Sequence, residues 1–244
     1  MKIDNTIDKL ISQKLRAENI LERENHISSG KLSASMLGQP LQWQVLKAIG
    51  VPAKEIDEYV LRVFKRGKDI EEWLVNQFTG LVETQKPVIY RNVVGFVDAV
   101  VDTKGYEFDE GIIPFEVKSV KNSKYKRIIE QIAPDHSHIL QGALYALAMD
   151  VKSFSVYYVA ADDLRVTSFV LPTDAYRTEI DRVIDRYDNQ LNMRLVPKFV
   201  PIEAWQSILQ YNNYPEWANL TDSQIVDKLM NEYPECHKKL INYK

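Results

Sequence analysis

Two acidic residues interrupt apolar segments that otherwise have the composition of buried strands. Asp98 lies within residues 93–101 and Glu116 within residues 112–120, each among Val, Ile, Phe and Ala. This composition is typical of central strands covered on both faces, so we expect both carboxylates to lie deep in the protein. If the two strands pair across the polar loop 102–111, the carboxylates come to lie side by side. Two carboxylates at low dielectric repel each other, and a divalent cation is their usual partner.

A lysine accompanies the second of these carboxylates. Lys118 follows Glu116 by two residues, so strand geometry puts both side chains on one face, about 7 Å apart along the chain. Beside two carboxylates, an ammonium group can orient or activate a water molecule, or it can form a buried ion pair with a purely structural role. Glu116-Val117-Lys118 is the only Glu-x-Lys in the chain, but such a short pattern leaves both interpretations open.

A third carboxylate belongs to a long amphipathic helix, expected over residues 54–78. Its apolar positions form one stripe at about 100° per residue, and Glu71 falls inside that stripe whereas Glu72 falls outside it. A carboxylate that faces a core is costly unless it has a partner. Glu71 is therefore either an edge residue that reaches water or an arginine, or a metal ligand or acid–base group.

A second helix, expected over residues 135–149, carries His138, Gln141 and Tyr145 on one face. That face is either the solvated side of the helix or part of a functional site.

A basic segment precedes this helix. Five basic residues occur within ten positions: Lys118, Lys121, Lys124, Lys126 and Arg127. One interpretation is a solvated loop, which is the usual meaning of a run of charges. The other is a surface that contacts phosphates, on which Tyr125 stacks against a base.

Composition limits the class of protein. The 244 residues include 31 Lys+Arg and 34 Asp+Glu, for a net charge of −3, with 45% hydrophobic and 27% charged residues. These values are typical of a globular protein and exclude a disordered chain, a collagen or a globally basic nucleic-acid binder. The single cysteine, Cys236, excludes an internal disulfide and a thiolate metal site. No apolar run of roughly 18 residues occurs, and the charged N-terminus is unlike a signal peptide, so we expect a cytoplasmic protein without membrane contacts.

The chain divides into three regions by pattern. Residues 1–53 are expected to be helical, with one helix over 33–49 that ends at Gly50-Val51-Pro52. Residues 54–172 predict a long helix, two strands, a helix and two further strands, an alternation that favours an α/β or α+β core. Residues 173–244 are expected to be mostly helical and interrupted by prolines.

In chain order, four motifs resemble those of the PD-(D/E)xK nuclease superfamily. They are Gly67-x-x-Ile70-Glu71-Glu72, Gly95-Phe96-Val97-Asp98, Phe115-Glu116-Val117-Lys118 and Gln141-x-x-x-Tyr145. The set is most similar to the RecB-like exonuclease branch, which includes CRISPR-associated and phage recombination exonucleases. The resemblance covers residues 32–172 and includes Ser33-Ala34-Ser35. It implies a restriction-endonuclease-like core of α/β (α+β) class, with a central mixed sheet flanked by helices and helical additions at both ends.

The resemblance also implies roles for individual residues. Asp98, Glu116 and the carbonyl of Val117 would hold Mg²⁺ or Mn²⁺, Glu71 would be an added ligand, and Lys118 would act on the attacking water. Gln141 and Tyr145 would hold the nucleic-acid strand or support the lysine.

Two departures from the family pattern affect the cofactor. Many relatives have His where this chain has Glu71. An oxygen ligand in place of a nitrogen ligand makes the ligand set harder and better suited to Mg²⁺ or Mn²⁺. Cluster-bearing relatives have cysteines that this chain lacks, so no iron–sulfur cluster is expected. The C-terminal segment is expected to close by packing aromatic side chains instead: Trp205, Tyr211, Tyr214 and Trp217.

The function that the resemblance implies is a metal-dependent DNA exonuclease that acts on single strands or duplex ends in recombination, repair or DNA degradation. DNA is the expected partner, and a recombination or annealing protein is a further candidate by analogy. Two alternatives stay open. One is an endonuclease of restriction type, and the other is a non-catalytic DNA-binding or scaffold protein with the same fold.

Overall fold

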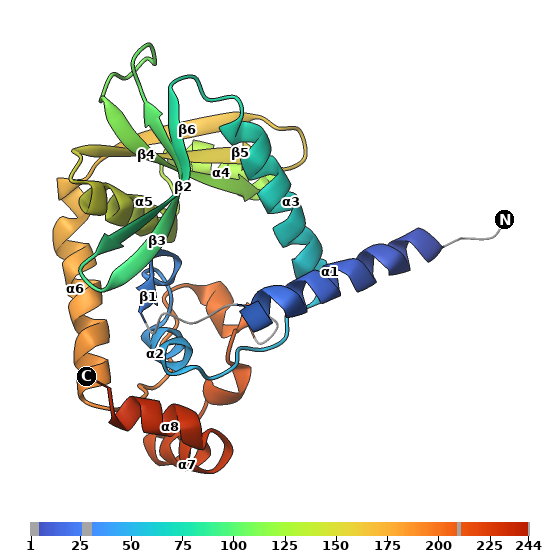
Figure 1. Ribbon diagram of the computed structural model, residues 1–244, viewed down its shortest axis with the longest axis vertical. Coiled ribbons are helices and arrows are strands. Elements are labelled where there is room, and N and C mark those ends of the chain that lie inside the picture. Colours follow the sequence, from blue (N-terminus) through green and yellow to red (C-terminus); the bar gives the residue numbers. More distant parts are fainter. Residues whose placement is uncertain (1–4, 26–30, 209–210, 244) are drawn as a thin grey trace.

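The computed structural model describes residues 5–25, 31–208 and 211–243, which form helices around one mixed sheet (Figure 1). The elements in chain order are α1 (Thr6–Asn25), β1 (Leu32–Ser33), the 3₁₀ helix η1 (Ala34–Met36), α2 (Leu41–Ile49), α3 (Glu58–Val75), β2 (Leu81–Tyr90), β3 (Val93–Asp102), β4 (Ile112–Val120), α4 (Asn122–Gln131), α5 (His136–Met149), β5 (Ser153–Ala160), β6 (Val166–Pro172), α6 (Asp174–Asn192), the 3₁₀ helices η2 (Ala204–Ser207) and η4 (Pro215–Trp217), α7 (Asp222–Glu232) and α8 (Pro234–Ile241).

The sheet has the order β1-β3-β4-β5-β6, and β2 pairs with the other edge of β3. β3 and β4 are antiparallel, β4 and β5 are parallel, and β5 and β6 are antiparallel. Since β2 follows β3 along nearly its whole length, β1 and β4 must share the opposite edge of β3. The result is a mixed sheet whose most buried strand, β5, has no exposed residue.

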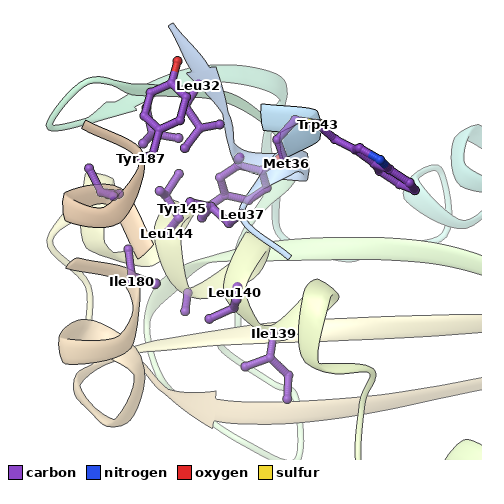
Figure 2. Close-up of a cluster of buried hydrophobic side chains, with 14 of the residues drawn as sticks. Leu32, Met36, Leu37, Trp43, Ile139, Leu140, Leu144, Tyr145, Ile180 and Tyr187 are labelled. Carbon is purple, nitrogen blue, oxygen red and sulfur yellow. The ribbon is translucent and has the colours of Figure 1, made fainter. Parts of the chain in front are cut away.

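Two hydrophobic clusters hold the helices against the sheet. The larger joins α5 and α6 to the N-terminal segment around η1 and α2, and Figure 2 shows Leu144 and Tyr145 of α5 beside Ile180 and Tyr187 of α6 in this cluster. The smaller packs α3 against β3, β4 and β5. The sheet is therefore covered on both faces, which explains why its central strands have so few polar residues.

The predicted fold class is confirmed, and several expected elements are present. The strands expected at 93–101 and 112–120 are β3 and β4, and they pair as a hairpin. The helix expected over 135–149 is α5. The helix expected over 54–78 is α3, which is shorter because Asp57 has an extended backbone and the residues before it form a loop.

Three details of the expected layout are wrong. Residues 33–49 are not one helix, because Gly38 and Pro40 separate η1 from α2. The strand β2 was not expected, since it is mostly exposed, has four consecutive polar residues at 83–86 and includes Pro87. The basic segment forms the helix α4, with Tyr125 and Ile128 on its buried side, rather than a loop.

The three predicted regions share one core. The larger cluster contains Trp43 from the N-terminal region, Tyr158 from the central region and Trp217 from the C-terminal region. The boundaries at residues 53 and 172 stay a prediction. Among the described helices, none has both the length and the hydropathy required to cross a bilayer.

The expected closure of the C-terminal segment by four aromatic rings is half right. Tyr214 and Trp217 are buried, and the hydroxyl of Tyr214 donates to the carbonyl of Val51. Trp205 and Tyr211 are instead 41% and 49% exposed. They lie outside the core, on the wall of a cavity described below.

Candidate active site

The candidate site lies where β3 and β4 separate. Their pairing runs from Asp102–Ile112 to Ala99–Phe115 and stops there. Beyond this point, β4 continues beside β5, whereas β3 pairs with β1 only at Val93 and Val94. The edge of β3 from residue 95 to residue 98 therefore has no strand beside it. We call this opening in the sheet the fork.

Asp98 is the first residue of β3 past the end of this pairing. Its Oδ2 accepts a hydrogen bond of 2.8 Å from the backbone N–H of Val117, a group that would otherwise be left unpaired at the fork. The side chain is buried, and burial raises the pKa of Asp98, while the ammonium of Lys118 and the Val117 N–H oppose that effect. Asp98 thus links the two strands and is also a charge at the opening.

Glu116 and Lys118 project together from β4, as the strand period predicts. Glu116 is fully buried and forms an ion pair with Lys118, but neither of its oxygens has a hydrogen-bond partner of ordinary geometry among the described residues. Burial, opposed mainly by Lys118, raises the pKa of Glu116 to about 8. Desolvation lowers the pKa of Lys118, but the carboxylates of Glu116 and Asp98 outweigh it, so the pKa is raised and the lysine stays charged.

Glu71 approaches the fork from α3. It is half-buried, and its Oε1 accepts a hydrogen bond of 2.9 Å from Nε2 of Gln85, which lies on β2 in a left-handed conformation (φ 49°). Burial and the charge of Asp98 raise the pKa of Glu71 to about 7. Glu71 lines a cavity and interacts electrostatically with Asp98 and Lys118, so its role as a ligand stays a prediction.

α5 supplies the opposite wall of the fork. Gln141 donates a hydrogen bond of 2.8 Å from Nε2 to the hydroxyl of Tyr145, and Tyr145 is buried. A Cβ on Gly95 would lie 2.5 Å from Cε1 of Tyr145, so only glycine lets the ring approach β3 this closely. Burial and the charge of Glu116 raise the pKa of Tyr145 far above its ordinary value, which keeps the hydroxyl protonated.

Known proteins match this arrangement by structure and not by sequence. No protein-family model matches the chain, and no curated protein does. An alkaline exonuclease from Laribacter hongkongensis, LHK-Exo, matches with a TM-score of 0.51 and 16% identity, covering 68% of this chain and 90% of its own. The protein SSO0001 matches with a TM-score of 0.54 and 16% identity, covering 86% and 98%. The chain shares with these two proteins a restriction-endonuclease-like fold, in which helices flank a central mixed sheet. The expected fold resemblance is confirmed.

The carboxylates at the fork fit a hard divalent cation in their chemistry. All the donors are oxygens, and the unsatisfied, buried oxygens of Glu116 are what a cation would relieve. As they stand, no three acidic, histidine or cysteine side chains of the described residues converge tightly enough to ligate one ion. Val117, Lys118 and Gln85 contact Asp98, Glu116 and Glu71 instead. The ligand set, including the carbonyl of Val117, stays a prediction.

His138 is held by a hydrogen-bond chain one turn before Gln141. The hydroxyl of Tyr158 accepts the N–H of Asp135 at 2.9 Å and also forms a hydrogen bond of 2.9 Å with Nδ1 of His138. Burial, together with Lys118 and Lys124, lowers the pKa of His138 to about 3, so the ring is neutral. Sequence reasoning missed Tyr158 because nothing in its strand sets it apart.

Four of the five basic residues lie beyond β4, on α4 or just before it, whereas Lys118 lies within β4. Lys121 and Lys126 are exposed, but Lys124 and Arg127 both form ion pairs with Asp135. The predicted stacking role of Tyr125 is wrong, because its ring is 3% exposed and lies under the guanidinium of Arg165, 5.2 Å away. Helix formation turns this ring inward, which the charge pattern of the segment did not indicate.

Proposed function

We propose that the protein is a DNA exonuclease that depends on Mg²⁺ or Mn²⁺. The observation that carries the proposal is the meeting of Asp98, Glu116 and Lys118 at the fork, with Glu71 approaching from α3. Burying several carboxylates around one lysine has a high desolvation cost, which favours a functional role for the set. The overall fold is one that also occurs in an alkaline exonuclease.

Asp98, Glu116, the carbonyl of Val117 and Glu71 are the residues that would hold the cation. When bound, the cation would supply a hydroxide at neutral pH and neutralise charge that develops on the phosphate. Lys118, held in its charged form by the carboxylates, would orient the attacking water and stabilise the pentacoordinate phosphate. Gln141 would contact the strand through its amide, while its bond to Tyr145 sets the direction of the side chain.

Solvent and substrate reach these groups through a cavity of about 500 Å³ between α1, α3 and β4. Its lining includes Glu71, Val117 and Lys118, together with Gly67 on the helix wall. A Cβ on Gly67 would meet nothing within 4 Å, so the cavity is open at this position. The volume is within the range of roughly 300–1,000 Å³ that is usual for ligand sites.

Two DNA forms distinguish the proposal from its alternatives. End-labelled linear DNA and closed circular DNA are incubated with Mg²⁺, with Mn²⁺ or with EDTA. An exonuclease releases label only from the linear form and only with a cation, whereas a restriction-type endonuclease also nicks the circle. A non-catalytic scaffold cleaves neither form, and that result would overturn the proposal.

Two variants connect cleavage to the fork. Asp98→Asn retains an oxygen that can accept from Val117 and removes only the charge, so it is expected to stay folded. Lys118→Ala removes the ammonium group. Each is expected to lower the cleavage rate by roughly 10²–10⁴-fold, the usual cost of losing one acid–base or electrostatic group. Full activity in either variant would contradict the assigned site. A role in recombination or repair, and an annealing protein as partner, are part of the same proposal.

A further inference from the structure

A second and larger cavity, of about 880 Å³, lies beside the candidate active site. Its walls are formed by Asn19 of α1, the loop from residue 50 to residue 57, the first turns of α3, Trp205 and residues 211–214 of the C-terminal region. The loop and the C-terminal segment are tied together, since the N–H of Lys54 donates to the carbonyl of Asn213 at 2.9 Å. The cavity is therefore held in shape by the backbone.

The two cavities are neighbours. Asn19 of α1 and Phe64 of α3 line both of them. The smaller cavity contains Glu71 and Lys118, so the larger one lies next to the candidate catalytic groups. A polymer that places one phosphate at the fork would have its neighbouring residues in this space.

Aromatic rings face the larger cavity and are free to stack. Phe64, Trp205 and Tyr211 are 52%, 41% and 49% exposed, and within the described ranges none of them packs against another ring. Trp205 is oriented by its indole N–H, which donates to Oε2 of Glu203 at 2.7 Å. Exposed rings held in a fixed orientation are the stacking surface that single-stranded nucleic-acid sites use.

The charges of the cavity favour stacking over ionic attraction. Its lining carries two lysines and two acids, and Lys54 forms an ion pair of 3.5 Å with Asp57. A cation stands close by, because Nζ of Lys121 lies 5.4 Å from the ring centroid of Tyr59 and interacts electrostatically with Tyr211. Rings that would hold bases are thus placed next to an exposed group that would hold a phosphate.

We propose that the larger cavity is a subsite for two or three unpaired nucleotides of the strand being degraded. Their bases stack on Phe64, Trp205 and Tyr211, and a phosphate contacts Lys121. A base that is paired in a duplex cannot present both faces to these rings, so the subsite selects single strands or frayed ends. This inference rests on the proposed function, because the bound nucleotides are taken to belong to a strand that also contacts Glu71 and Lys118.

The test is a fluorescence titration with an eight-residue oligothymidylate in EDTA, where no cleavage occurs. Trp43 and Trp217 are fully buried, so quenching by stacked bases must come from Trp205 or from Trp73, which is 37% exposed on α3. The quenching is expected to persist in Trp73→Phe and to disappear in Trp205→Phe. Trp73 is the matched control, since it lines neither cavity.

Affinity is measured with a labelled oligonucleotide. The double variant Trp205→Ala/Tyr211→Ala is expected to bind the single strand about 5- to 100-fold more weakly, which corresponds to the usual worth of one or two stacked bases. Its melting temperature is expected to match the parent, because both rings are exposed. A blunt duplex is expected to compete poorly with the single strand.

These experiments distinguish a failure of the nucleotide subsite from a failure of the nuclease proposal. Unchanged affinity in the double variant, or quenching that survives Trp205→Phe, would overturn the subsite whether or not the protein cleaves DNA. Conversely, quenching that depends on Trp205 in a protein that cleaves no DNA with Mg²⁺ or Mn²⁺ would support the subsite and overturn the nuclease proposal.

Discussion

Glu116 is costly to keep ionised in its position. Its carboxylate is fully buried, and Lys118 is its one partner of opposite charge among the described residues. The ion pair offsets only part of the desolvation cost of the carboxylate. Each oxygen without a hydrogen-bond partner increases the remaining cost. A divalent cation would supply the missing interaction, so the free protein at neutral pH should hold a proton at Glu116.

The first prediction concerns Glu116→Gln and the pH dependence of stability. The pKa of Glu116 is about 8 in the folded protein, whereas that of an unperturbed glutamate is 4.5. The folded state therefore binds the proton more tightly than the unfolded state, and the resulting stability is complete below pH 4.5 and lost as the pH rises through 8. In EDTA, the melting temperature of the parent should fall from pH 6 to pH 9 more steeply than that of Glu116→Gln.

Mg²⁺ provides the control for this prediction. Because the cation binds the ionised carboxylates, its stabilising effect should be larger at pH 8 than at pH 6 in the parent and small in Glu116→Gln. Parallel melting curves for the two proteins in EDTA would show that Glu116 is already ionised in the free protein.

At the scale of elements, the site depends on how closely α5 approaches β3. The two elements touch through the ring of Tyr145 and the backbone of Gly95. A side chain at position 95 would push α5 away from the fork and move Gln141 and Tyr145 together. The glycine is thus explained by a close packing contact rather than by its backbone angle.

Gly95→Ala is expected to destabilise the protein by about 1–3 kcal/mol, the usual cost of overpacking a core. The added Cβ would lie 2.5 Å from the Tyr145 ring and 3.0 Å from Cβ of Ala34, and neither neighbour can move freely. Gly67→Ala is the matched control. It adds the same methyl in open space within α3 and should stabilise the protein by about 0.5–1 kcal/mol. Chemical denaturation measures both, and equal effects would contradict the packing argument.

The ion pairs of α4 divide its basic residues into two groups. Lys121 and Lys126 are exposed, whereas Asp135 already neutralises Lys124. Substitution of Lys121 or Lys126 by Ala should reduce the slope of log affinity against log salt concentration by about 0.7 for a single strand, the value for one lost phosphate contact. Lys124→Ala should change it less. An equal loss in all three variants would mean that DNA displaces Asp135.

At the scale of the whole molecule, the terminal regions complete the core that supports the site. Trp217 is fully buried, its carbonyl accepts from Gln42, and Nζ of Lys228 lies 5.5 Å from its ring centroid. The same cluster reaches Tyr145 on α5. The C-terminal helices therefore stabilise the wall of the fork, although they contribute no catalytic candidate.

Trp217→Ala is expected to cost about 3–5 kcal/mol, the usual effect of removing a buried tryptophan. Because the cluster is continuous, unfolding should remain a single transition by both far-ultraviolet and near-ultraviolet circular dichroism. Trp73→Ala, which removes a ring that is 37% exposed, should cost less than Trp217→Ala. A separate early transition in Trp217→Ala would instead show that the C-terminal region folds independently.

Local patterns in the sequence predict the strands β3 and β4 and the charged side chains that they carry. Apolar runs interrupted by Asp98 and Glu116 identify buried strands with buried charges, and the strand period places Lys118 beside Glu116. These inferences hold because they depend on local periodicity and on the cost of burying a carboxylate, both of which operate over a few residues.

The opening in the sheet and the exposure of the aromatic rings depend on contacts between segments that are distant in the sequence. The fork exists because β1 and β4 share one edge of β3 and leave residues 95–98 between them, a result of pairings between distant segments. Tyr125 became buried and Trp205 exposed for the same kind of reason, since packing against elements remote in sequence decides which face of a short segment meets water. Local patterns contain no information about such partners.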